Sequence, residues 1–277
     1  MECSIIKKMK LIAYSRGDVA GDNIARILQK DFGFSESDMS FDGVPIRERD
    51  GVLLVESKES ILHRSEFGGL NPGILVVASR HRSESGEPTL TCHVTGNFGG
   101  ADFGGLPGRL SIAPALYLRE ALIGLREKAA GLDYQISLEV THHGPSELPF
   151  PIVFVEVGST EKQWRDDSAC QVVAFVISDL VSRESKKVPV GIGFGGPHYA
   201  PNFTEVVENV ALGHIMPKYA TEFLSRAMVE QMISRTVPKP EFAVLDWKGL
   251  RSEEKKAVTE ILEEIGLPSK RTSELKD

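Results

Sequence analysis

The stretch "GILVVAS" (Gly73–Ser79) decides the fold class. It is a continuous apolar run and not an alternation of apolar and polar side chains. A strand with one solvated face alternates, whereas a parallel strand that is buried on both faces is apolar along its whole length. The sequence therefore predicts a buried parallel strand here, and "GVLLVES" (Gly51–Ser57) predicts a second strand of the same kind.

Helical segments separate the predicted strands. After a first strand at "KLIAYS" (Lys10–Ser15), apolar side chains recur at helical spacing. Longer helices are predicted from Ser111 to Gly131 and from Thr160 to around Ser185, and an amphipathic helix begins near Ser252. Alternating strands and helices are typical of an α/β protein. We therefore expect a three-layer α/β/α fold around a mostly parallel, mixed sheet.

The polar stretch "GFSESDMSFDGVPIRERDG" (33–51) interrupts this alternation and is predicted to be a loop. It is the best candidate for a boundary between two subdomains. We expect a small N-terminal α/β subdomain over residues 1–66 and a catalytic α/β/α domain over residues 67–277. The final residues, "SKRTSELKD" (269–277), are polar, and we expect them to be frayed.

Composition limits the class of protein. The chain has 277 residues, a net charge of -7 and three widely spaced cysteines without a CxxC pair. The negative charge argues against a protein that coats nucleic acid through a general positive field, although it allows a local basic patch. We find no secretory-signal pattern and no apolar run long enough to cross a bilayer. We expect a cytoplasmic protein that binds neither membrane nor DNA.

Four histidines follow predicted strands. His81 comes after "GILVVAS", His142 and His143 come after "YQISLEV", and His198 comes after "VPVGIGFG". In open α/β sheets, ligands bind in the crevice outside the carboxyl ends of the strands. Any one of these histidines alone is more easily explained as a hydrogen-bonded structural residue. Their common placement predicts that they gather at one edge of the sheet and form a functional site.

The same segments suggest metal binding or acid–base chemistry. Neutral imidazole is the commonest metal ligand, and zinc sites combine His with Asp or Glu, although no HExxH motif is present. Glu156 interrupts the apolar run "IVFVEVGS", and a carboxylate in a buried strand is costly unless it is paired or bound to a metal. Adjacent His142 and His143 are expected to point in opposite directions if the strand's alternation continues. His93 is predicted to lie inside a strand and His214 in a loop.

Two glycine-rich segments, "GNFGGADFGGLPG" (96–108) and "GIGFGGPHYAPN" (191–202), are candidate ligand-binding loops. They match neither the GxGxxG pattern before a helix nor a Walker A loop, which argues against the common nucleotide sites. Glycines let the backbone approach a ligand closely, so its N–H groups suit a carbonyl oxygen or a phosphate. The alternative is that these loops only turn tightly. The candidate substrate-binding residues are Asn97, Phe98, Gly99, Gly100, Gly195 and Gly196.

A family resemblance rests on a set of motifs in a fixed order. These motifs are "TGNFGGADFGG" (95–105), "VTHHGP" (140–145), "IVFVEVGSTEKQW" (152–164), "GIGFGGPHYAPNFTE" (191–205) and "ALGHIMPKY" (211–219). The chain resembles the archaeal and plant type of D-aminoacyl-tRNA deacylase. The resemblance implies hydrolysis of the ester that joins a D-amino acid to the 3′ end of tRNA, so D-aminoacyl-tRNA is the expected partner. It also implies a zinc cofactor and a fold related to phosphorylases and peptidyl-tRNA hydrolases.

The resemblance also implies roles for the candidate residues. The zinc ligands would come from His81, His142, His143, Glu156 and His198. The catalytic residues that handle the attacking water would be His142, His143, Glu156 and His198. Backbone N–H groups of the glycine-rich loops would stabilise the oxyanion, and Arg80 and Lys218 would contact tRNA. A monomer is favoured, and the oligomeric state is left open.

Two other interpretations stay open at this point. A zinc-dependent amidohydrolase or peptidase that acts on a small metabolite would share the histidines and the fold, but it would be indifferent to tRNA. A non-catalytic tRNA-binding module, with structural histidines, would retain tRNA without turnover. The family resemblance favours the deacylase over both.

Overall fold

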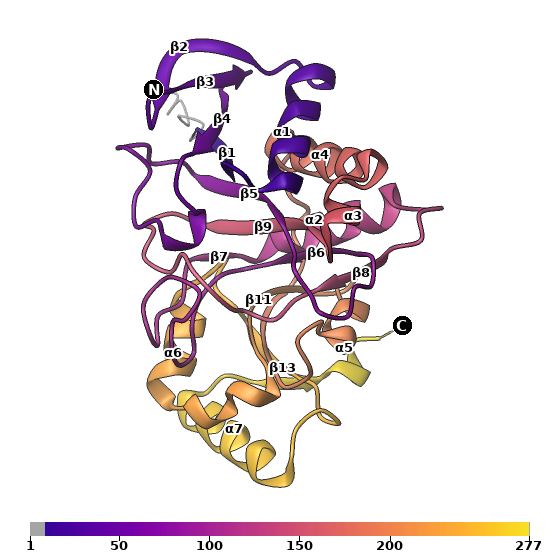
Figure 1. Ribbon diagram of the computed structural model, residues 1–277. Coiled ribbons are helices and arrows are strands. Elements are labelled where there is room, and N and C mark those ends of the chain that lie inside the picture. The colour runs from indigo at the N-terminus through magenta and orange to yellow at the C-terminus, as the bar shows by residue number, and fades with distance from the viewer. Residues whose placement is uncertain (1–8, 277) are drawn as a thin grey trace, which may run out of the picture.

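The computed structural model describes residues 9–276. The larger of its main sheets has eight strands in the order β2-β3-β4-β1-β5-β9-β6-β8 (Figure 1). These strands are β1 (Lys10–Ser15), β2 (Ser35–Phe41), β3 (Val44–Arg49), β4 (Val52–Ser57), β5 (Ile74–Arg80), β6 (Thr89–His93), β8 (Gln135–Leu138) and β9 (Ile152–Gly158). The apolar runs that predict buried strands, β4 and β5, lie inside this sheet, as expected.

Strand direction reverses within this sheet. The strands β4, β1, β5 and β9 are parallel to one another, whereas β6 runs antiparallel to β9 and parallel to β8. At the other side, β3 runs antiparallel to β4. The sheet is therefore mixed and mostly parallel, which confirms the predicted fold class.

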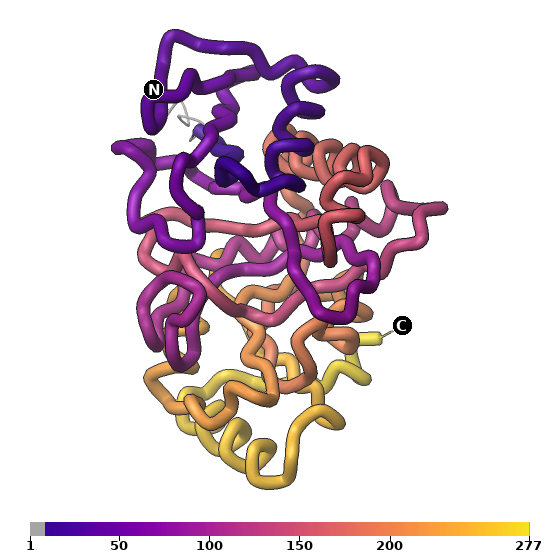
Figure 2. Tube along the Cα trace, viewed as in Figure 1, coloured from indigo at the N-terminus to yellow at the C-terminus, as the bar shows by residue number. Residues whose placement is uncertain are grey.

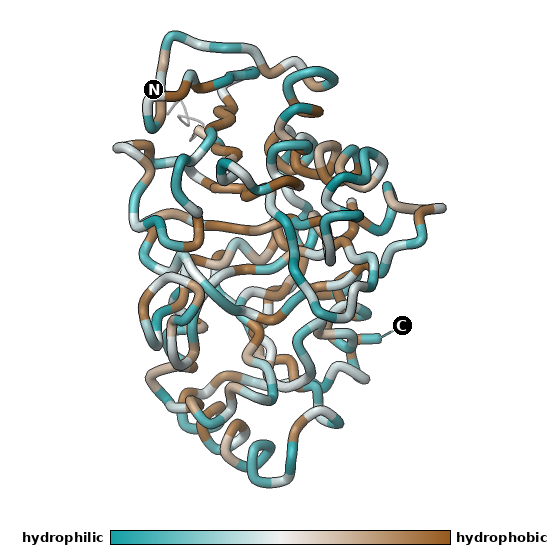
Figure 3. Tube along the Cα trace, in the orientation of Figure 1, coloured by the Kyte–Doolittle hydropathy of each residue, from teal (hydrophilic) through white to brown (hydrophobic). Residues whose placement is uncertain are grey.

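Helices cover one face of this sheet. They are α1 (Val19–Asp31), α2 (Ala115–Lys128) and α4 (Asp167–Ser182). Because side chains alternate along a strand, Val76 and Val155 pack in the cluster that contains these helices, while Val77 and Phe154 pack on the opposite face. Loops around Phe67 cover part of that second face. The apolar strand segments lie in the interior of the molecule (Figure 3).

The segment predicted to be a loop between residues 33 and 51 is instead a β-hairpin. Strands β2 and β3 pair antiparallel through Asp42 and Gly43, which have φ values of 52° and 71°. An Asp-Gly pair with two positive φ angles is the signal of a tight hairpin turn, and it was overlooked because β2 is mostly exposed and lacks an apolar face. The subdomain boundary near residue 66 stays a prediction. Strands from both sides of it pair in one sheet.

A second, fully parallel sheet follows in the C-terminal part of the chain, with the order β11-β10-β13-β14. Its strands are β10 (Val190–Phe194), β11 (Ala211–Met216), β13 (Phe242–Leu245) and β14 (Ser269–Arg271). Helix α2 contacts β11, and α6 (Arg226–Ser234) and α7 (Ser252–Ile265) pack in the cluster on the other side of the sheet. This arrangement forms three layers. Figure 2 shows that the N-terminal strands and the C-terminal helices lie at opposite ends of the molecule.

The remaining elements are short. They are β7 (Ala113–Pro114), β12 (Thr236–Val237), α3 (Glu161–Trp164), α5 (Pro201–Glu205), η1 (Ile61–His63), η2 (Lys218–Phe223) and η3 (Thr272–Glu274). The helix predicted from Thr160 onward is divided into α3 and α4, because the side chain of Asp166 accepts a hydrogen bond from Ser168 N and starts a new helix. Among residues 9–276, we find no helix of the length and apolarity needed to cross a bilayer.

The polar C-terminal stretch is ordered, contrary to the prediction of a frayed tail. Strand β14 pairs with β13 through its backbone, which needs no apolar side chain. The side chains also contribute, because Lys270 Nζ lies 4.7 Å from the ring centroid of Phe242 and Arg271 Cζ lies 4.4 Å from that of Trp247. Cation–aromatic contacts of this kind are not visible as a pattern in a single sequence.

His214 lies in strand β11 and not in the predicted loop. Its side chain is fully buried, with Nε2 3.0 Å from Ser111 O and Nδ1 3.2 Å from Thr141 Oγ1. Burial is the main reason that the pKa of His214 falls to about 4. The neutral imidazole of His214 therefore connects the second sheet to the segments that contain Ser111 and Thr141.

We predict that His214 makes the protein sensitive to acid. Since its pKa is lower in the folded protein than its ordinary value of 6.5, its contribution to stability is present above pH 6.5 and is lost as the pH falls toward 4. The variant His214→Gln should be less stable at pH 7, but its free energy of unfolding should fall less between pH 6.5 and pH 4. Urea unfolding of both proteins across this range measures the difference, and identical pH slopes would contradict the prediction.

Candidate active site

The predicted site residues gather on the face of the large sheet opposite the helices. Phe154 and Glu156 both point to this face of β9, and His93 of β6 pairs with Phe154. Glu139 follows β8 directly, and His81 follows β5 and lies over the same face. The expectation of a single sheet edge was wrong, because β8 runs antiparallel to β5 and their carboxyl ends face opposite edges. The histidines and carboxylates meet because alternate side chains of neighbouring strands point to the same face of the sheet.

The second sheet supplies His198, which follows β10. The segment after β8 runs beside this sheet, because Val140 N donates to His198 O at 3.0 Å and Thr141 N donates to Ile215 O at 3.0 Å. The imidazole rings of His142 and His198 lie 4.7 Å apart, centroid to centroid. The candidate site therefore lies where the two sheets meet.

His142 and His143 point to the same side, contrary to the expectation from strand alternation. The alternation ends at His143, which has a φ of 42°, a backbone conformation that a residue other than glycine seldom adopts. The carbonyl of His143 accepts a hydrogen bond from Gly96 N at 2.7 Å, which helps to hold this conformation. As a result the two ring centroids are only 4.4 Å apart.

Three rings share one hydrogen-bonding pattern. Nδ1 lies within hydrogen-bond distance of a backbone carbonyl in His142 (2.8 Å), His143 (2.6 Å) and His93 (3.3 Å). One ring nitrogen from each of the three residues lies within 4.8 Å of the others. Burial lowers the pKa of His142 well below its usual range and that of His143 to about 4. Neutral rings with Nδ1–H bound to the backbone leave Nε2 as the available lone pair.

Glu139 is a buried carboxylate among these rings. Its Oε2 lies 2.7 Å from His198 Nε2 and 3.4 Å from His142 Nε2. Its Oε1 lies 3.1 Å from His81 Nδ1, without the alignment of a hydrogen bond. Burial opposes the charge, but the hydrogen bond from His198 and the nearby imidazoles hold the pKa of Glu139 well below its usual range.

Glu156 is the second buried carboxylate of the site. Its Oε2 lies 3.5 Å from His81 Nδ1 and 3.6 Å from His93 Nε2. Burial again opposes the charge, but these contacts lower the pKa of Glu156 to about 2. Although burial acts in the other direction, Glu156 and Glu139 raise the pKa of His81 to about 10. The second nitrogen of His81 lies 2.9 Å from Tyr199 Oη.

Sequence reasoning did not select Glu139 or His93 as site residues. Glu139 had the same signal as Glu156, since both carboxylates occur among apolar residues of a strand, in "ISLEV" and in "IVFVEV". His93 is predicted to lie inside a strand, and a strand position alone gives no information on what its side chain faces.

A cavity of about 360 Å³ opens beside His142, His143 and His198. The predicted loop residues Asn97, Phe98, Gly99 and Gly100 line it. The Asn97 amide holds its own loop together by donating to Gly104 O at 2.8 Å, and Phe98 is only 6% exposed and packs in the C-terminal core. Gly99 and Gly100 leave backbone facing the cavity.

Other predicted substrate-binding residues lie outside this cavity. Gly195 and Gly196 have φ values of 100° and 80° and pack closely against Asp246, so they serve a tight turn after β10. Arg80 lines a separate recess of about 530 Å³, in which its guanidinium carbon lies 5.1 Å from the ring centroid of Trp164. Lys218 is exposed at the start of η2.

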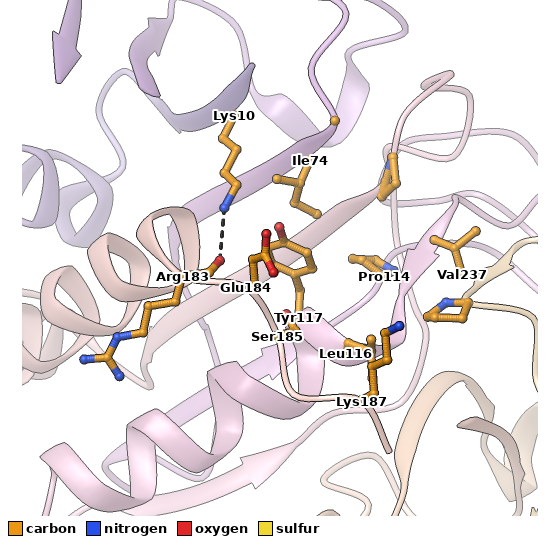
Figure 4. Close-up of a pocket in the computed structure, with 13 residues that line it drawn as sticks. Lys10, Ile74, Pro114, Leu116, Tyr117, Arg183, Glu184, Ser185, Lys187 and Val237 are labelled. Atoms are coloured by element: carbon orange, nitrogen blue, oxygen red, sulfur yellow. Dashed lines mark hydrogen bonds between the residues drawn. The ribbon is translucent and has the colours of Figure 1, made fainter. Parts of the chain in front are cut away.

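A larger cavity of about 720 Å³ lies at the opposite edge of the large sheet (Figure 4). Ile74 and Pro114 belong to its mainly apolar wall, and Lys10 Nζ donates to Arg183 O at 3.2 Å beside it. No histidine of residues 9–276 lines this cavity. It therefore lacks the imidazoles that distinguish the smaller cavity.

Comparisons with known proteins agree over most of the chain. The family model described as D-aminoacyl-tRNA deacylase matches residues 69–270. A D-aminoacyl-tRNA deacylase of Thermococcus kodakarensis is 37% identical over 269 residues, covering 94% of this chain and 98% of that protein. The one of Methanosarcina mazei is 38% identical over 225 residues, covering 79% of this chain and 74% of that protein. The crystal structure of a conserved protein of unknown function matches with a TM-score of 0.89 at 33% identity and covers 97% of each chain.

The fold and the site together define a mixed α/β enzyme with a histidine–carboxylate centre beside a cavity. The chain belongs to the D-aminoacyl-tRNA deacylase family. The resemblance carried by the sequence motifs is therefore confirmed. The expected relation to phosphorylases and peptidyl-tRNA hydrolases stays a prediction.

We predict that the contact between Glu156 and His81 makes the metal-free protein sensitive to alkali. Since the pKa of His81 is raised to about 10, its contribution to stability is present below pH 6.5 and is lost as the pH rises through 10. In Glu156→Gln a main cause of the raised pKa is removed. The free energy of unfolding should then fall less between pH 7 and pH 10 than in the wild type.

The matched control is Glu161→Gln, which removes an exposed carboxylate paired with Arg165. Urea unfolding of chelator-treated proteins measures the pH dependence of all three. If the free energy of unfolding of Glu156→Gln falls as much between pH 7 and pH 10 as that of the wild type, Glu156 does not raise the pKa of His81. The exposed control should keep the wild-type slope, because exposed ion pairs contribute little.

Proposed function

We propose that this enzyme hydrolyses the ester between a D-amino acid and the 3′-terminal ribose of tRNA at the cavity beside His142, His143 and His198. The proposal rests on three imidazoles that line this cavity and on two buried carboxylates that contact the histidine cluster, in a chain whose relatives are D-aminoacyl-tRNA deacylases. The reaction consumes one water and yields a free D-amino acid and a tRNA with a free 3′-hydroxyl. Because charged tRNA is used in the cytoplasm, we propose that compartment.

The donor set fits the zinc ion that we propose as cofactor. The nitrogens offered by His93, His142 and His143 lie within 4.8 Å of one another. Their Nδ1–H groups face backbone carbonyls, and such outer partners fix the tautomer that a ligand needs. His93 Nε2 is buried without a hydrogen-bond partner among residues 9–276. Glu156 raises the pKa of His93 against the effect of burial, so a proton and a metal ion compete for this nitrogen.

These three histidines would hold the ion, and Glu156 Oε2, 3.6 Å from His93 Nε2, could add a carboxylate. A zinc ion held there would lower the pKa of water from about 15.7 toward about 7 and polarise the ester carbonyl. Two of the predicted ligands, His142 and His143, belong to this set. The predicted ligands His198 and His81 belong to two further groups that share Glu139, and His142 belongs to the His198 group as well.

His198 is proposed as the acid–base residue. Its Nε2 donates to Glu139 Oε2 at 2.7 Å, so the carboxylate keeps a proton on Nε2 and makes Nδ1 the nitrogen that can accept one. Nδ1 lies 3.2 Å from Tyr219 Oη, at the wall of the cavity. We propose that Nδ1 takes the proton of the attacking water and returns it to the ribose 3′-oxygen as the ester C–O bond breaks. Glu139 then acts as a positioning residue.

The remaining predicted residues would hold the substrate. Backbone N–H groups of Gly99 and Gly100, which line the cavity without side chains, are proposed to stabilise the oxyanion. Arg80 and Lys218 are exposed and are proposed to contact phosphates of the tRNA. Arg80 is already held in place by its stacking on Trp164.

The two rival interpretations are less well supported than the deacylase. A small-amide hydrolase and a non-catalytic tRNA-binding module are both compatible with the histidine cluster alone. The curated relatives, however, are named D-aminoacyl-tRNA deacylases and match nearly the whole chain. We therefore keep these interpretations only as outcomes of the experiment below.

Release of labelled amino acid from matched D-Tyr-tRNA and L-Tyr-tRNA, with and without a chelator, tests the proposed function. We expect release of the D-amino acid alone, lost with the chelator and restored by zinc. Release that survives complete metal removal would exclude a catalytic zinc while keeping the deacylase. Retention of tRNA without release would favour the binding module, and hydrolysis of small amides alone would favour the rival hydrolase.

We predict that Glu139→Gln lowers kcat by about 10²–10⁴-fold, the usual contribution of acid–base catalysis, because His198 loses its orienting carboxylate. KM should change little, since Glu139 is buried and does not line the cavity. The matched control is Glu56→Gln, which removes a partly buried carboxylate of β4 that pairs with Arg16 and does not line the cavity. Steady-state kinetics measure both variants, and a wild-type kcat for Glu139→Gln would exclude the proposed role.

A further inference from the structure

Exposed aromatic rings surround the mouth of the catalytic cavity. Phe103, Tyr219 and Phe223 are 73%, 55% and 43% exposed. They are the most exposed aromatic side chains among residues 9–276, and all three line this cavity. Scattered apolar side chains on a surface need no explanation, whereas a cluster at one opening marks a binding site. The rings therefore form an aromatic rim, defined here by these three residues.

The backbone that carries Phe103 is fixed, although the ring is in solvent. Gly144 N donates to Phe103 O at 3.0 Å, and the Asn97 amide donates to Gly104 O at 2.8 Å. A Cβ added to Gly104 would lie 2.0 Å from Leu62 O, so the loop packs closely against the neighbouring chain. An exposed ring on a fixed backbone loses little conformational freedom when a ligand binds, which favours affinity.

The other two rings come from η2. Tyr219 Oη lies 3.2 Å from His198 Nδ1, so this ring lies directly beside the proposed acid–base residue. The ring of Phe223 lies against the backbone of Gly99, where an added Cβ would be 2.3 Å from the ring. The aromatic rim is thus continuous with the proposed catalytic groups and with the glycine loop.

The charge of the lining indicates what the aromatic rim binds. No lysine or arginine of residues 9–276 lines this cavity. Asp102 adds a carboxylate to the lining, and a cationic recess formed by Arg80 and Arg82 is a separate feature beside Trp164. A phosphate requires cations, whereas a nucleobase offers a flat π face that stacks on aromatic rings. The rim therefore suits a planar aromatic group better than a phosphate.

We propose that Phe103, Tyr219 and Phe223 form a stacking platform for the base of the 3′-terminal nucleoside of the substrate tRNA. The inference rests on the proposed function, in which the ester is carried by the ribose of that nucleoside. When the ester carbonyl reaches His142 and His198, the ribose holds the base within one nucleoside length, at the mouth of the cavity. Stacking on rings is suited to an unpaired, single-stranded end.

Phe103→Ala and Phe223→Leu test this platform. Each should raise KM for D-aminoacyl-tRNA by roughly 5- to 100-fold, the range that corresponds to the loss of one base stack. The increase should be the same for D-Tyr-tRNA and D-Ala-tRNA, because the base and not the amino acid is held. The control is Met39→Ala, which truncates a 43% exposed side chain on β2, far from the cavity in the strand order.

A second measurement needs no turnover. Uncharged tRNA with 2-aminopurine as its 3′-terminal base should lose fluorescence on binding the wild type, and this quenching should be much weaker with Phe103→Ala. If the KM increase occurs with D-Tyr-tRNA but not with D-Ala-tRNA, the rim holds the amino acid side chain and the proposal is wrong. Unchanged quenching and KM would also overturn it. Absence of ester hydrolysis by the wild type would contradict the proposed function, while the quenching would still report on the platform.

Discussion

The buried carboxylates of Glu139 and Glu156 are the constraint on which the site depends. A charge inside a protein costs several kcal/mol unless hydrogen bonds and opposite charges compensate it. Both carboxyl groups have a lowered pKa, since imidazoles contact them. The two acids therefore stay charged and fix which histidines can hold a proton. His81 gains proton affinity from them, whereas His143 has a pKa of about 4 and stays neutral.

The different pKa values of these histidines follow from their distances to the two carboxylates. His81 lies within 3.5 Å of both carboxylates, so an imidazolium there compensates their charge. His142 and His143 lie among other rings, and a second positive charge beside them would be repelled. One part of the cluster is thus a cation in the metal-free protein and another part is a set of free lone pairs. The proposed site would then combine two neutral imidazoles, His142 and His143, with carboxylates whose charge is compensated by His81.

The strand reversal between β9 and β6 makes this arrangement possible. In a fully parallel sheet the residues after β5 and β8 would meet at one edge. The strand partners of Glu156 are Ser79 of β5 and Thr91 of β6, so no imidazole is paired with it directly. Because β6 runs the other way, His93 comes to lie opposite Phe154, one step from Glu156 on the same face. The pair of strands thereby places an imidazole and a carboxylate in the interior of a sheet face.

Sequence patterns predicted the buried strands, the α/β class and most of the histidine cluster. They did so because apolar runs and the residues that follow them are local properties. The direction of β6, the partners of Glu139 and the positive φ of His143 depend on contacts between distant segments, and no periodicity encodes them. The hairpin at Asp42–Gly43 is different, since its signal was local and present but was outweighed by a polar composition.

Chiral selection sets a further requirement on this geometry. A site distinguishes mirror images only when three different substituents of the stereocentre are located. In the proposed reaction the histidine cluster locates the ester carbonyl and the aromatic rim locates the terminal nucleoside, but both groups belong to the same substituent of the α-carbon. The amino group and the side chain must therefore be located separately, by other parts of the cavity wall. Phe223 packs so closely on Gly99 that no larger residue fits at position 99, so this part of the wall is fixed in shape and suits that task.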